Sequence, residues 1–227
     1  VQAQAQQMKL AALGRLTANM AHEIRNPLAA ISHAAELLAE EQRDSLHQRL
    51  GRIIHDNTQR LNRLVTEVLE LGRRDRAQPE TLRWSSFLAG FLDELALHEP
   101  SSARRVLVAE GDVELHFDRG HLYRVLWNLV GNALRHASAA DGAVYLQARS
   151  GPAGEKIELL ISDDGPGVEE AARGQVFEPF FTTHGAGTGL GLYIARELCE
   201  ANGASLELLD ESPGAHFRIR AEGNPCR

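Results

Sequence analysis

Two apolar seams run through residues 1–74 and constrain the fold more than any other feature of this chain. The first seam comprises Leu10, Leu13, Thr17, Met20, Ile24, Leu28, Ile31, Ala35 and Leu38. The second comprises Leu50, Ile54, Asn57, Leu61, Leu64, Val68 and Leu71. Because steps of three and four keep side chains on one helix face, the pattern predicts a long helix over 1–40 and a second ending near Arg74. The charged segment 40–44 between them is predicted to be a turn.

Two long helices with a short connection form an antiparallel hairpin. A hairpin with a single apolar stripe cannot bury that stripe by itself. Pairing of two hairpins into a four-helix bundle solves the problem, so the sequence predicts a homodimer. The alternative is a hairpin that packs on its own C-terminal domain.

Composition limits the remaining possibilities. A chain of 227 residues fits one large or two small domains, and the charged, proline-ended segment 73–79 predicts a linker between domains 1–76 and 77–227. The net charge of -7 and the pI near 5.8 argue against a nucleic-acid partner. Cys199 and Cys226 form neither a disulfide framework nor a metal spacing, which suits a reducing cytoplasm.

Membrane-spanning and secretory signals are both missing from the sequence. No apolar run reaches the length of about 18 residues that a membrane span requires, so no membrane contact is predicted within this fragment. No basic segment precedes an apolar one in the manner of a signal peptide. Because the helical pattern is already running at Val1, we expect more protein upstream.

Strand and helix patterns are mixed after the linker without strict alternation. The predicted helices are 85–97, 119–137 and 191–202, and the predicted strands are 106–109, 113–117, 143–148, 157–162, 205–209 and 216–220. This order predicts an α+β sandwich rather than a doubly wound parallel sheet. The fold class expected for the whole chain is therefore a helical hairpin followed by an α+β sandwich.

Asn128 and Asn132 are four residues apart in the predicted helix 119–137, so they share one helix face. Two amides on one face can offer oxygen atoms to a hard cation such as Mg²⁺, which otherwise keeps water and phosphate ligands. A pair of solvated asparagines is the alternative interpretation.

Two glycine-rich segments follow. In 163–167, Asp-Asp-Gly-Pro-Gly comes directly after a strand, where an acidic side chain can accept a hydrogen bond from an exocyclic amine and glycines let a flat ring approach. An ordinary strand-ending turn uses the same residues. In 185–192, glycines before a helix expose backbone N–H groups to a phosphate. This segment matches neither a dinucleotide fingerprint nor a P-loop, and a mobile capped loop is its alternative.

Taken together in this order and spacing, residues 80–227 resemble the ATP-binding domain shared by histidine kinases, type II topoisomerases, Hsp90 and MutL. Residues 1–75 resemble the dimerisation and phosphotransfer domain of sensor histidine kinases. The matching motifs are an H-box at 21–28, an N-box at 128–136, an F-box at 176–181 and G-boxes at 163–167 and 187–191. Phe-Thr-Thr at 181–183 and the segment 191–200 are most similar to the NtrB/PilS-like class.

The resemblance implies ATP and Mg²⁺ as cofactors. It assigns Asn132 to Mg²⁺, Asn128 and Arg135 to the phosphates, and Asp163 to the adenine amine. The full implied ATP site is Asn128, Asn132, Arg135, Asp163, Gly165, Gly167, Thr183, Gly187, Thr188, Gly189, Leu190 and Gly191. Two departures concern His184, where a lysine is frequent, and 214–217, which lacks the threonine or serine often found near adenine.

His22 is the expected phosphate acceptor. Seam residues Met20 and Ile24 lie on either side of it, which predicts that His22 projects from the flank of the bundle. A neutral imidazole nitrogen is the nucleophile toward the γ-phosphorus, and Glu23 can accept the other ring proton or hold the tautomer. A surface histidine without a role is the alternative. A zinc site of the His-Glu-x-x-His type is excluded because Asn26 occupies its last position.

Asn26 and Pro27 follow His22 within the H-box. Asn26 shares the helix face of His22, and the resemblance links Glu-x-x-Asn to dephosphorylation of the partner protein. Pro27 removes one backbone hydrogen bond, so we expect a bend that serves as a hinge between kinase and phosphatase geometries.

The leading hypothesis is an ATP-dependent protein histidine kinase. It autophosphorylates His22 and passes the phosphoryl group to an aspartate of a response regulator, NtrC-like if the subtype holds. The resemblance places the fragment in the cytoplasmic portion of a membrane-anchored sensor. An ATPase clamp is the first rival, although it leaves the H-box without purpose and normally has a glutamate at the position of Asn128. A non-catalytic dimeric scaffold is the second.

Overall fold

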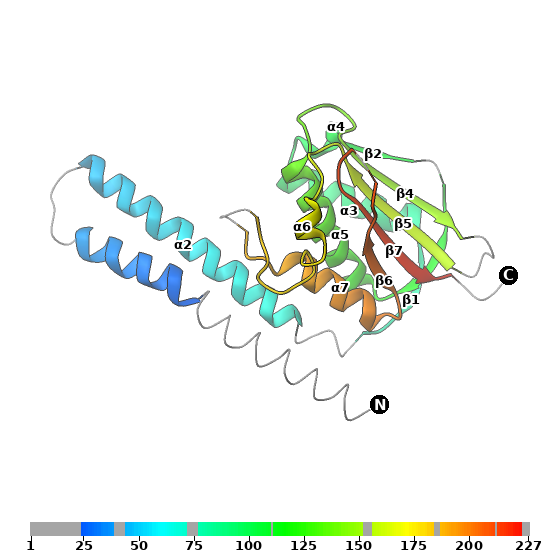
Figure 1. Ribbon diagram of the computed structural model, residues 1–227, viewed down its shortest axis with the longest axis horizontal. Helices are drawn as coiled ribbons and strands as arrows, with labels where there is room; N and C mark the ends of the chain where they lie inside the picture. Colours follow the sequence, from blue (N-terminus) through cyan, green and yellow to red (C-terminus); the bar gives the residue numbers. More distant parts are fainter. Residues whose placement is uncertain are drawn as a thin grey trace, which may run out of the picture. The chain divides into compact units, whose positions relative to one another are not determined.

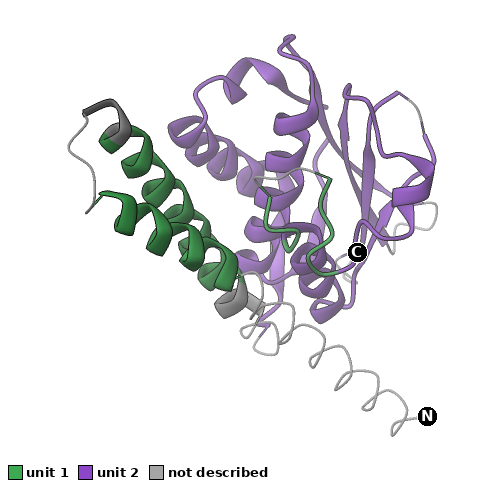
Figure 2. Cartoon of the chain, turned by 60° about the vertical axis from the view of Figure 1, so that its left-hand side comes forward, with its two compact units in different colours: residues 1–69, 179–190 green, residues 70–178, 191–227 purple. Residues whose placement is uncertain are grey.

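The computed structural model describes residues 24–38, 44–71, 77–109, 111–151, 156–183, 187–211 and 213–223. The chain divides into two compact units, which Figure 2 distinguishes by colour. Unit 1 comprises residues 1–69 and 179–190, and unit 2 comprises residues 70–178 and 191–227. The predicted domain boundary after residue 76 adjoins segment 72–76, which lies outside the described residues, and stays a prediction.

Unit 1 contains a helical hairpin. A helix over residues 24–38 runs beside α2, which spans Asp44–Leu71 (Figure 1). Both predicted helices are therefore present over their described parts. In the described part of the chain, no helix combines the length and apolarity that a bilayer crossing requires.

The apolar side chains of the hairpin fall into two groups. Pro27 and Ala34 on the first helix are buried, as are Leu50 and Leu64 on α2. Leu28, by contrast, is 49% exposed although it belongs to the predicted seam. On α2, Val65 is similarly exposed at 51%. The helices thus carry apolar surface beyond what one hairpin buries, as expected for helices with more than one neighbour.

Unit 2 is built on a mixed five-stranded sheet with the order β2-β4-β5-β7-β6. These strands are β2 Val106–Val108, β4 Val144–Ser150, β5 Lys156–Asp163, β7 His216–Glu222 and β6 Ser205–Leu208. β2 runs parallel to β4, and the other neighbours are antiparallel. A separate antiparallel pair joins β1 (Glu80–Arg83) to β3 (Glu114–Phe117).

The helices of unit 2 lie together on one side of the five-stranded sheet (Figure 1). The long ones are α3 Trp84–His98, α5 Arg119–His136 and α7 Gly191–Ala201, and the short ones are α4 Ser102–Arg105 and α6 Glu170–Arg173. Alternate residues of β5 and β7 point into the interface between these layers and are buried, which explains the period-two pattern of the strands. This architecture confirms the predicted α+β sandwich.

Three short elements, β1, α4 and α6, were not predicted from the sequence. Each has only four residues, too few to show a period, and their buried residues are limited to Leu82 of β1 and Ser102 of α4. The structure also places the predicted strands 106–109 and 113–117 in different sheets. Their partners lie far along the chain, and no local pattern specifies such pairing.

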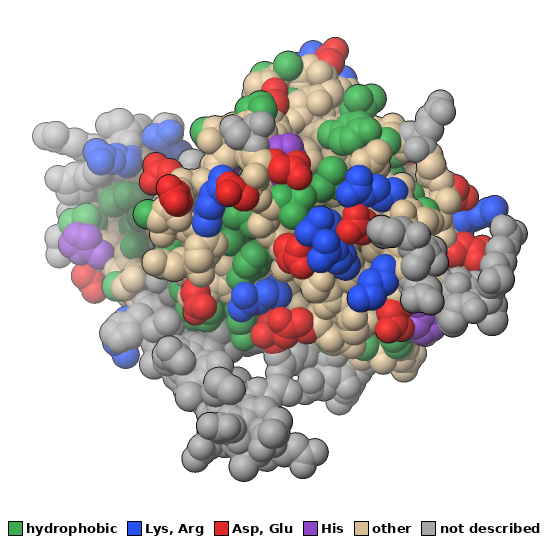
Figure 3. Space-filling model, turned by 45° about the vertical axis from the view of Figure 1, so that its right-hand side comes forward, with side chains coloured by type: hydrophobic (Ala, Val, Ile, Leu, Met, Phe, Trp, Pro, Cys, Tyr) green, Lys and Arg blue, Asp and Glu red, His purple; other side chains and the backbone are tan. Residues whose placement is uncertain are grey.

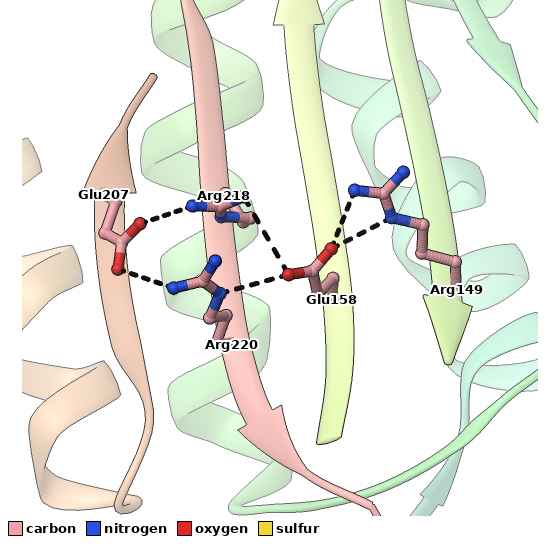
Figure 4. Close-up of polar contacts among 5 residues, drawn as sticks. All are labelled: Arg149, Glu158, Glu207, Arg218 and Arg220. Atoms are coloured by element: carbon pink, nitrogen blue, oxygen red, sulfur yellow. Dashed lines mark hydrogen bonds and ion pairs between the residues drawn. The ribbon is translucent and has the colours of Figure 1, made fainter. Parts of the chain in front are cut away.

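The other face of the sheet carries a charged network (Figure 4). Glu158 lies at its centre and contacts Arg149 at 2.8 Å and Arg220 at 3.0 Å. Glu207 contacts Arg218 at 2.8 Å and Arg220 at 3.3 Å. In Figure 3, acidic and basic side chains are interspersed rather than gathered by sign. The ladder of ion pairs therefore crosses β4, β5, β7 and β6 along the polar face.

Candidate functional site

Asp118 fixes the beginning of α5. Its Oδ1 accepts the N–H of His121 at 2.9 Å as an N-cap, and its Oδ2 accepts the amide of Gln78 at 2.8 Å. Partial burial acts to raise the pKa of Asp118, but the hydrogen bonds from Gln78 and His121 outweigh it and hold the pKa below its ordinary value. Because the cap fixes where α5 begins, it also fixes the direction in which each later side chain projects from the helix.

One face of α5 presents the polar residues predicted for the phosphate end of the site. Asn128 and Asn132 are half-buried, and Arg135 in the last turn is exposed. The Nδ2 atom of Asn128 is buried without a hydrogen-bond partner. Leaving such a donor unpaired costs about 1–3 kcal/mol, which a ligand accepting its hydrogen bond would recover.

Gly191 begins α7 directly beside this face. A Cβ added at Gly191 would lie 3.3 Å from Oδ1 of Asn128, so the helix backbone and the amide are already in close contact. The fold thereby brings the predicted N-box and the end of the second glycine segment together. Seven α5 and α7 residues seal this helix pair from water: Leu122, Val125, Leu126, Leu129, Ile194, Ala195 and Leu198 are buried.

Asp163 stands at the end of β5 with 6% of its surface exposed. Its Oδ1 accepts two backbone hydrogen bonds, from Gly165 at 2.9 Å and from Ala215 at 3.2 Å. Within the described residues, Oδ2 has no such partner. Two donors from different segments therefore hold the carboxylate in place and leave one oxygen available to accept a hydrogen bond from a ligand amine.

Glycines allow the turn after β5 to pack closely on its surroundings. A Cβ at Gly165 would lie 2.7 Å from the carbonyl oxygen of His136 at the end of α5. Gly167 has a φ of 75°, and a Cβ there would lie 2.9 Å from the carbonyl oxygen of Gly214. Both glycines are therefore needed for the close packing of this turn on the protein backbone, and the approach of a ligand ring to them stays a prediction.

The loop of residues 179–190 belongs to unit 1, and a backbone hydrogen bond joins its two ends. The N–H of Phe180 donates to the carbonyl of Gly189 at 2.9 Å, and both residues have positive φ angles, of 67° and 72°. A Cβ at Gly189 would lie 2.4 Å from the carbonyl carbon of Phe180, so glycine is required there. Residues 184–186 of this loop, including His184, lie outside the described residues.

The other predicted residues of this loop differ in exposure. Thr183 is exposed, Gly187 is half-buried, and Thr188 and Leu190 are buried. The loop belongs to unit 1 and the Asp163 turn to unit 2. The assignment of the loop to ATP remains a prediction from the sequence.

One contributor to the Asp163 site has no signal in the sequence. The backbone amide of Ala215 donates a hydrogen bond to Oδ1 of Asp163, and the side chains at 214–217 do not indicate this backbone contact. Phe177 of the predicted F-box packs edge-on against Phe217 at 6.3 Å, with the guanidinium of Arg196 5.2 Å from its ring centroid. Phe177 and Phe217 are visible as aromatic residues in the sequence, but their contact depends on tertiary packing.

The H-box is described only in part. His22 and Glu23 lie outside the described residues. Asn26 is exposed on the helix over 24–38, and Pro27, the next residue, is buried. The side chain of Asn26 is therefore accessible to solvent in the single chain.

A metal at the α5 face would depend on amide and phosphate oxygens. Among the described residues, no group of three or more His, Cys, Asp or Glu side chains could hold a metal ion. Mg²⁺ usually keeps several waters and is bound by one or two carboxylates together with substrate phosphates, and here the amide oxygen of Asn132 would take the place of a carboxylate. Asn132 beside the unpaired amide of Asn128 fits that kind of site.

Family models match both parts of the chain. Residues 12–77 match the His Kinase A (phospho-acceptor) domain, and residues 117–224 match the histidine kinase-, DNA gyrase B- and HSP90-like ATPase domain. The chain belongs to the sensor histidine kinase family. The sequence resemblance is thus confirmed, and the predicted H-box, N-box and G-boxes lie inside the matched regions.

Individual relatives agree with this assignment. Sensor protein kinase PilS of Pseudomonas aeruginosa is 46% identical over 98% of this chain and 41% of its own length. Signal transduction histidine-protein kinase AtoS of Escherichia coli is 31% identical over 97% of this chain and 36% of its own length. This chain therefore spans less than half of these relatives.

Solved structures show the same fold. Histidine kinase ThkA, in complex with the response regulator protein TrrA, aligns with a TM-score of 0.76 at 23% identity, covering 96% of this chain and 64% of that one. The Acinetobacter baumannii histidine kinase AdeS aligns with a TM-score of 0.68 at 19% identity, covering 89% and 98%.

Proposed function

We propose that this chain is the phosphotransfer and ATP-binding part of a protein histidine kinase. It uses ATP to phosphorylate His22 and passes the phosphoryl group to an aspartate of a response regulator, NtrC-like by the likeness to PilS. The observation that carries the proposal is the Asp163 carboxylate. It is buried and held by two backbone donors through Oδ1, and within the described part of the chain no hydrogen bond engages Oδ2.

Nucleotide binding follows from the residues around that carboxylate. Asp163 accepts the exocyclic amine of adenine, and the turn at Gly165 and Gly167 lies beside the ring. Asn128 and Arg135 contact the phosphates from α5. Asn132 would hold Mg²⁺, which when bound would supply positive charge beside the transferred phosphoryl group. The family resemblance further assigns phosphate binding to Thr183, Gly187, Thr188, Gly189, Leu190 and Gly191.

The transfer step requires a neutral imidazole at His22. A ring nitrogen of His22 bonds to the γ-phosphorus while the bond from that phosphorus to the bridging β,γ-oxygen breaks and ADP departs. Glu23 accepts or orients the proton on the other ring nitrogen. The phosphohistidine then passes its phosphoryl group to the carboxylate of the response regulator.

A phosphatase activity toward the response regulator is the second candidate. The observation in its favour is Asn26, which is exposed on the helix that follows His22. Its amide can hold a water molecule for attack on the phosphoaspartate. An Asn26→Ala variant is expected to keep phosphorylating His22 while it loses the ability to clear phosphate from the regulator.

We further infer that two copies pair through the hairpin. Leu28 and Val65 are apolar and about half exposed in the single chain, so a second hairpin would bury them. The family match of residues 12–77 to a phospho-acceptor domain supports this pairing. By the same family likeness, the fragment is the cytoplasmic portion of a membrane-anchored sensor.

Incubation with Mg²⁺ and ATP labelled in its γ-phosphate tests the proposal. Label that is stable in base, labile in acid and lost in His22→Gln supports a histidine kinase. ATP turnover without labelled protein would instead indicate an ATPase clamp. If neither occurs although the chain is folded, the kinase proposal is wrong and a scaffold role is favoured. Receiver domains added to the labelled protein then reveal the phosphate acceptor.

A further inference from the structure

A cluster of hydrogen bonds connects the end of α5 to the turn that carries Asp163. Its members are Arg105, Ser138 and Asp164, which come from the α4–β2 junction, the segment after α5 and the turn after β5. None of them belongs to the predicted ATP site. All three lie in unit 2 together with Asp163.

Arg105 closes the C-terminal end of α5. Its Nη2 donates to the carbonyl oxygens of Leu134 at 2.7 Å, Ser138 at 3.0 Å and Ala137 at 3.3 Å. The last carbonyls of a helix have no partner within the helix, and a guanidinium there also complements the helix dipole. Arg105 therefore fixes the path of the chain from α5 into Ser138.

Hydrogen bonds between Ser138 and Asp164 link this segment to the turn after β5. The backbone N–H of Ser138 donates to Oδ1 of Asp164 at 2.8 Å, and its hydroxyl donates to Oδ2 at 2.6 Å. The N–H of Asp164 in turn donates to the carbonyl of Ala143 at 3.0 Å. The two hydrogen bonds from Ser138 lower the pKa of Asp164, with Arg105 contributing, so the carboxylate stays ionised at neutral pH.

Asp164 lies between the two groups that define the Asp163 site. On one side Asp163 carries the carboxylate, and on the other Gly165 supplies the amide that holds its Oδ1 at 2.9 Å. The same Gly165 presses against the carbonyl of His136, to which a Cβ would approach within 2.7 Å. A shift of Asp164 would therefore move both the carboxylate and its backbone donor.

We propose that Asp164, braced by Ser138 and Arg105, is a positioning residue that aims Oδ2 of Asp163 at the exocyclic amine of the nucleotide base. This inference rests on the proposed binding of ATP. Asp164 is exposed and touches no substrate in this scheme, so its effect is confined to the orientation of Asp163. The hydrogen bonds of Asp164 thus set the preference for adenine over a base that has an oxygen in place of the exocyclic amine.

The preference between ATP and inosine triphosphate measures that orientation. Hypoxanthine has a carbonyl oxygen where adenine has its amine, so Asp163 accepts a hydrogen bond from ATP and faces an acceptor in the analogue. Asp164→Ala is expected to lower the ATP-to-ITP ratio of binding constants about tenfold, the order of one misaligned charge-assisted hydrogen bond. The maximal rate of His22 phosphorylation at saturating ATP should stay within about twofold, because the phosphate end is untouched.

Companion variants separate positioning from general stability. Asp164→Asn keeps one oxygen acceptor for Ser138 and should restore most of the ATP-to-ITP ratio. Ser138→Ala removes the hydroxyl, which donates to Asp164 and accepts the N–H of Ala140 at 3.2 Å, but keeps the backbone hydrogen bond to Asp164, so it should lower the ratio by a smaller factor. Asp112→Ala is the matched control. It deletes a carboxylate that accepts the amide of Ser85 at 3.0 Å near the start of α3, and the ratio should not change. If Asp164→Ala does not fold, the ATP-to-ITP ratio measured for Ser138→Ala still tests the positioning role.

A double variant tests the route of the effect. In an Asp163→Asn background, the further change Asp164→Ala should leave the ratio unaltered, since the aimed carboxylate is already gone. If Asp164→Ala weakens both nucleotides equally, or neither, the positioning role is wrong while the proposed function stands. If the unaltered chain binds no ATP, the proposed function fails and this inference fails with it.

Discussion

The contact between Gly214 and Asp163 allows a quantitative test of how the nucleotide turn is built. Gly214 has a φ of 88°, and a Cβ added to it would lie 1.6 Å from the carbonyl oxygen of Asp163. Gly203, after α7, has a similar φ of 68° but nothing within 4 Å of its Cβ position. The two glycines therefore both have a positive φ and differ in the space available around an added Cβ.

The difference in space predicts a difference in stability. Replacing Gly203 with alanine incurs the left-handed backbone penalty alone, about 1–2 kcal/mol. In Gly214→Ala, the Asp163 carbonyl must also retreat from 1.6 Å to at least 3.0 Å, and that carbonyl belongs to the backbone of β5. We expect Gly214→Ala to lower the free energy of unfolding by about 3 kcal/mol or more, as strained core substitutions do.

Urea unfolding followed by tryptophan fluorescence measures this effect in the right part of the chain. The chain has two tryptophans, Trp84 and Trp127, and both lie in unit 2. ATP affinity provides the second readout, because the amide of Ala215 next to Gly214 binds Oδ1 of Asp163. Gly214→Ala should weaken ATP binding at least about tenfold, and Gly203→Ala should leave it unchanged.

Equal behaviour of the two variants would refute the reasoning. If Gly214→Ala lost no more stability than Gly203→Ala and bound ATP normally, the close approach of the loop to β5 would not be needed for the site. Gly214→Ala could also lose ATP affinity without losing more stability than Gly203→Ala. That result would mean that the turn adjusts locally and that the expected displacement of the β5 backbone is too large.

Three other predictions follow from the described contacts. Glu158→Gln should lower the free energy of unfolding by about 1–2 kcal/mol at pH 7, because hydrogen bonds from Arg149 and Arg220 hold the pKa of Glu158 below its ordinary value. That stabilisation is complete above the unfolded-state pKa and is lost as pH falls through the lower folded-state pKa, so the wild-type and variant urea curves should converge in acid. Cys199 is buried, which raises the pKa of its thiol, so in a Cys226→Ser background a thiol reagent should label it only after urea unfolding; rapid labelling of the folded chain would contradict this. Pro27→Ala should change the ratio of kinase to phosphatase activity, measured with one receiver domain, and an unaltered ratio would exclude the hinge.

Local patterns in the sequence predicted most of the secondary structure elements. The seams predicted both helices of the hairpin, and the apolar periods of 119–137 and 157–162 predicted α5 and β5 nearly to their observed bounds. These elements are long enough for side chains on one face to repeat several times. The four-residue elements β1, α4 and α6 are too short to repeat, so the same reasoning missed them.

The hairpin shows a limit of pattern reading in a long element. The seam correctly identified a helix, yet it placed Leu28 among residues expected in one continuous stripe. Within the single chain, Pro27 and Ala34 are buried and Leu28 is half exposed. Periodicity shows that a face is apolar, but which neighbour covers each part of it depends on how many helices surround that face.

The sequence by itself determined which chemical groups this protein has available. Asn128, Asn132 and Asp163 were identified with their glycine segments, because hydrogen-bonding side chains and flexible backbone leave a local signature. Only the tertiary structure decided how Asp163 is held, since one of its two donors, Ala215, is 52 residues away along the chain. That contact depends on the antiparallel pairing of β5 with β7. Strand pairing is a long-range property, because the register of each pair is set by burial across the whole sheet and not by the residues of one segment.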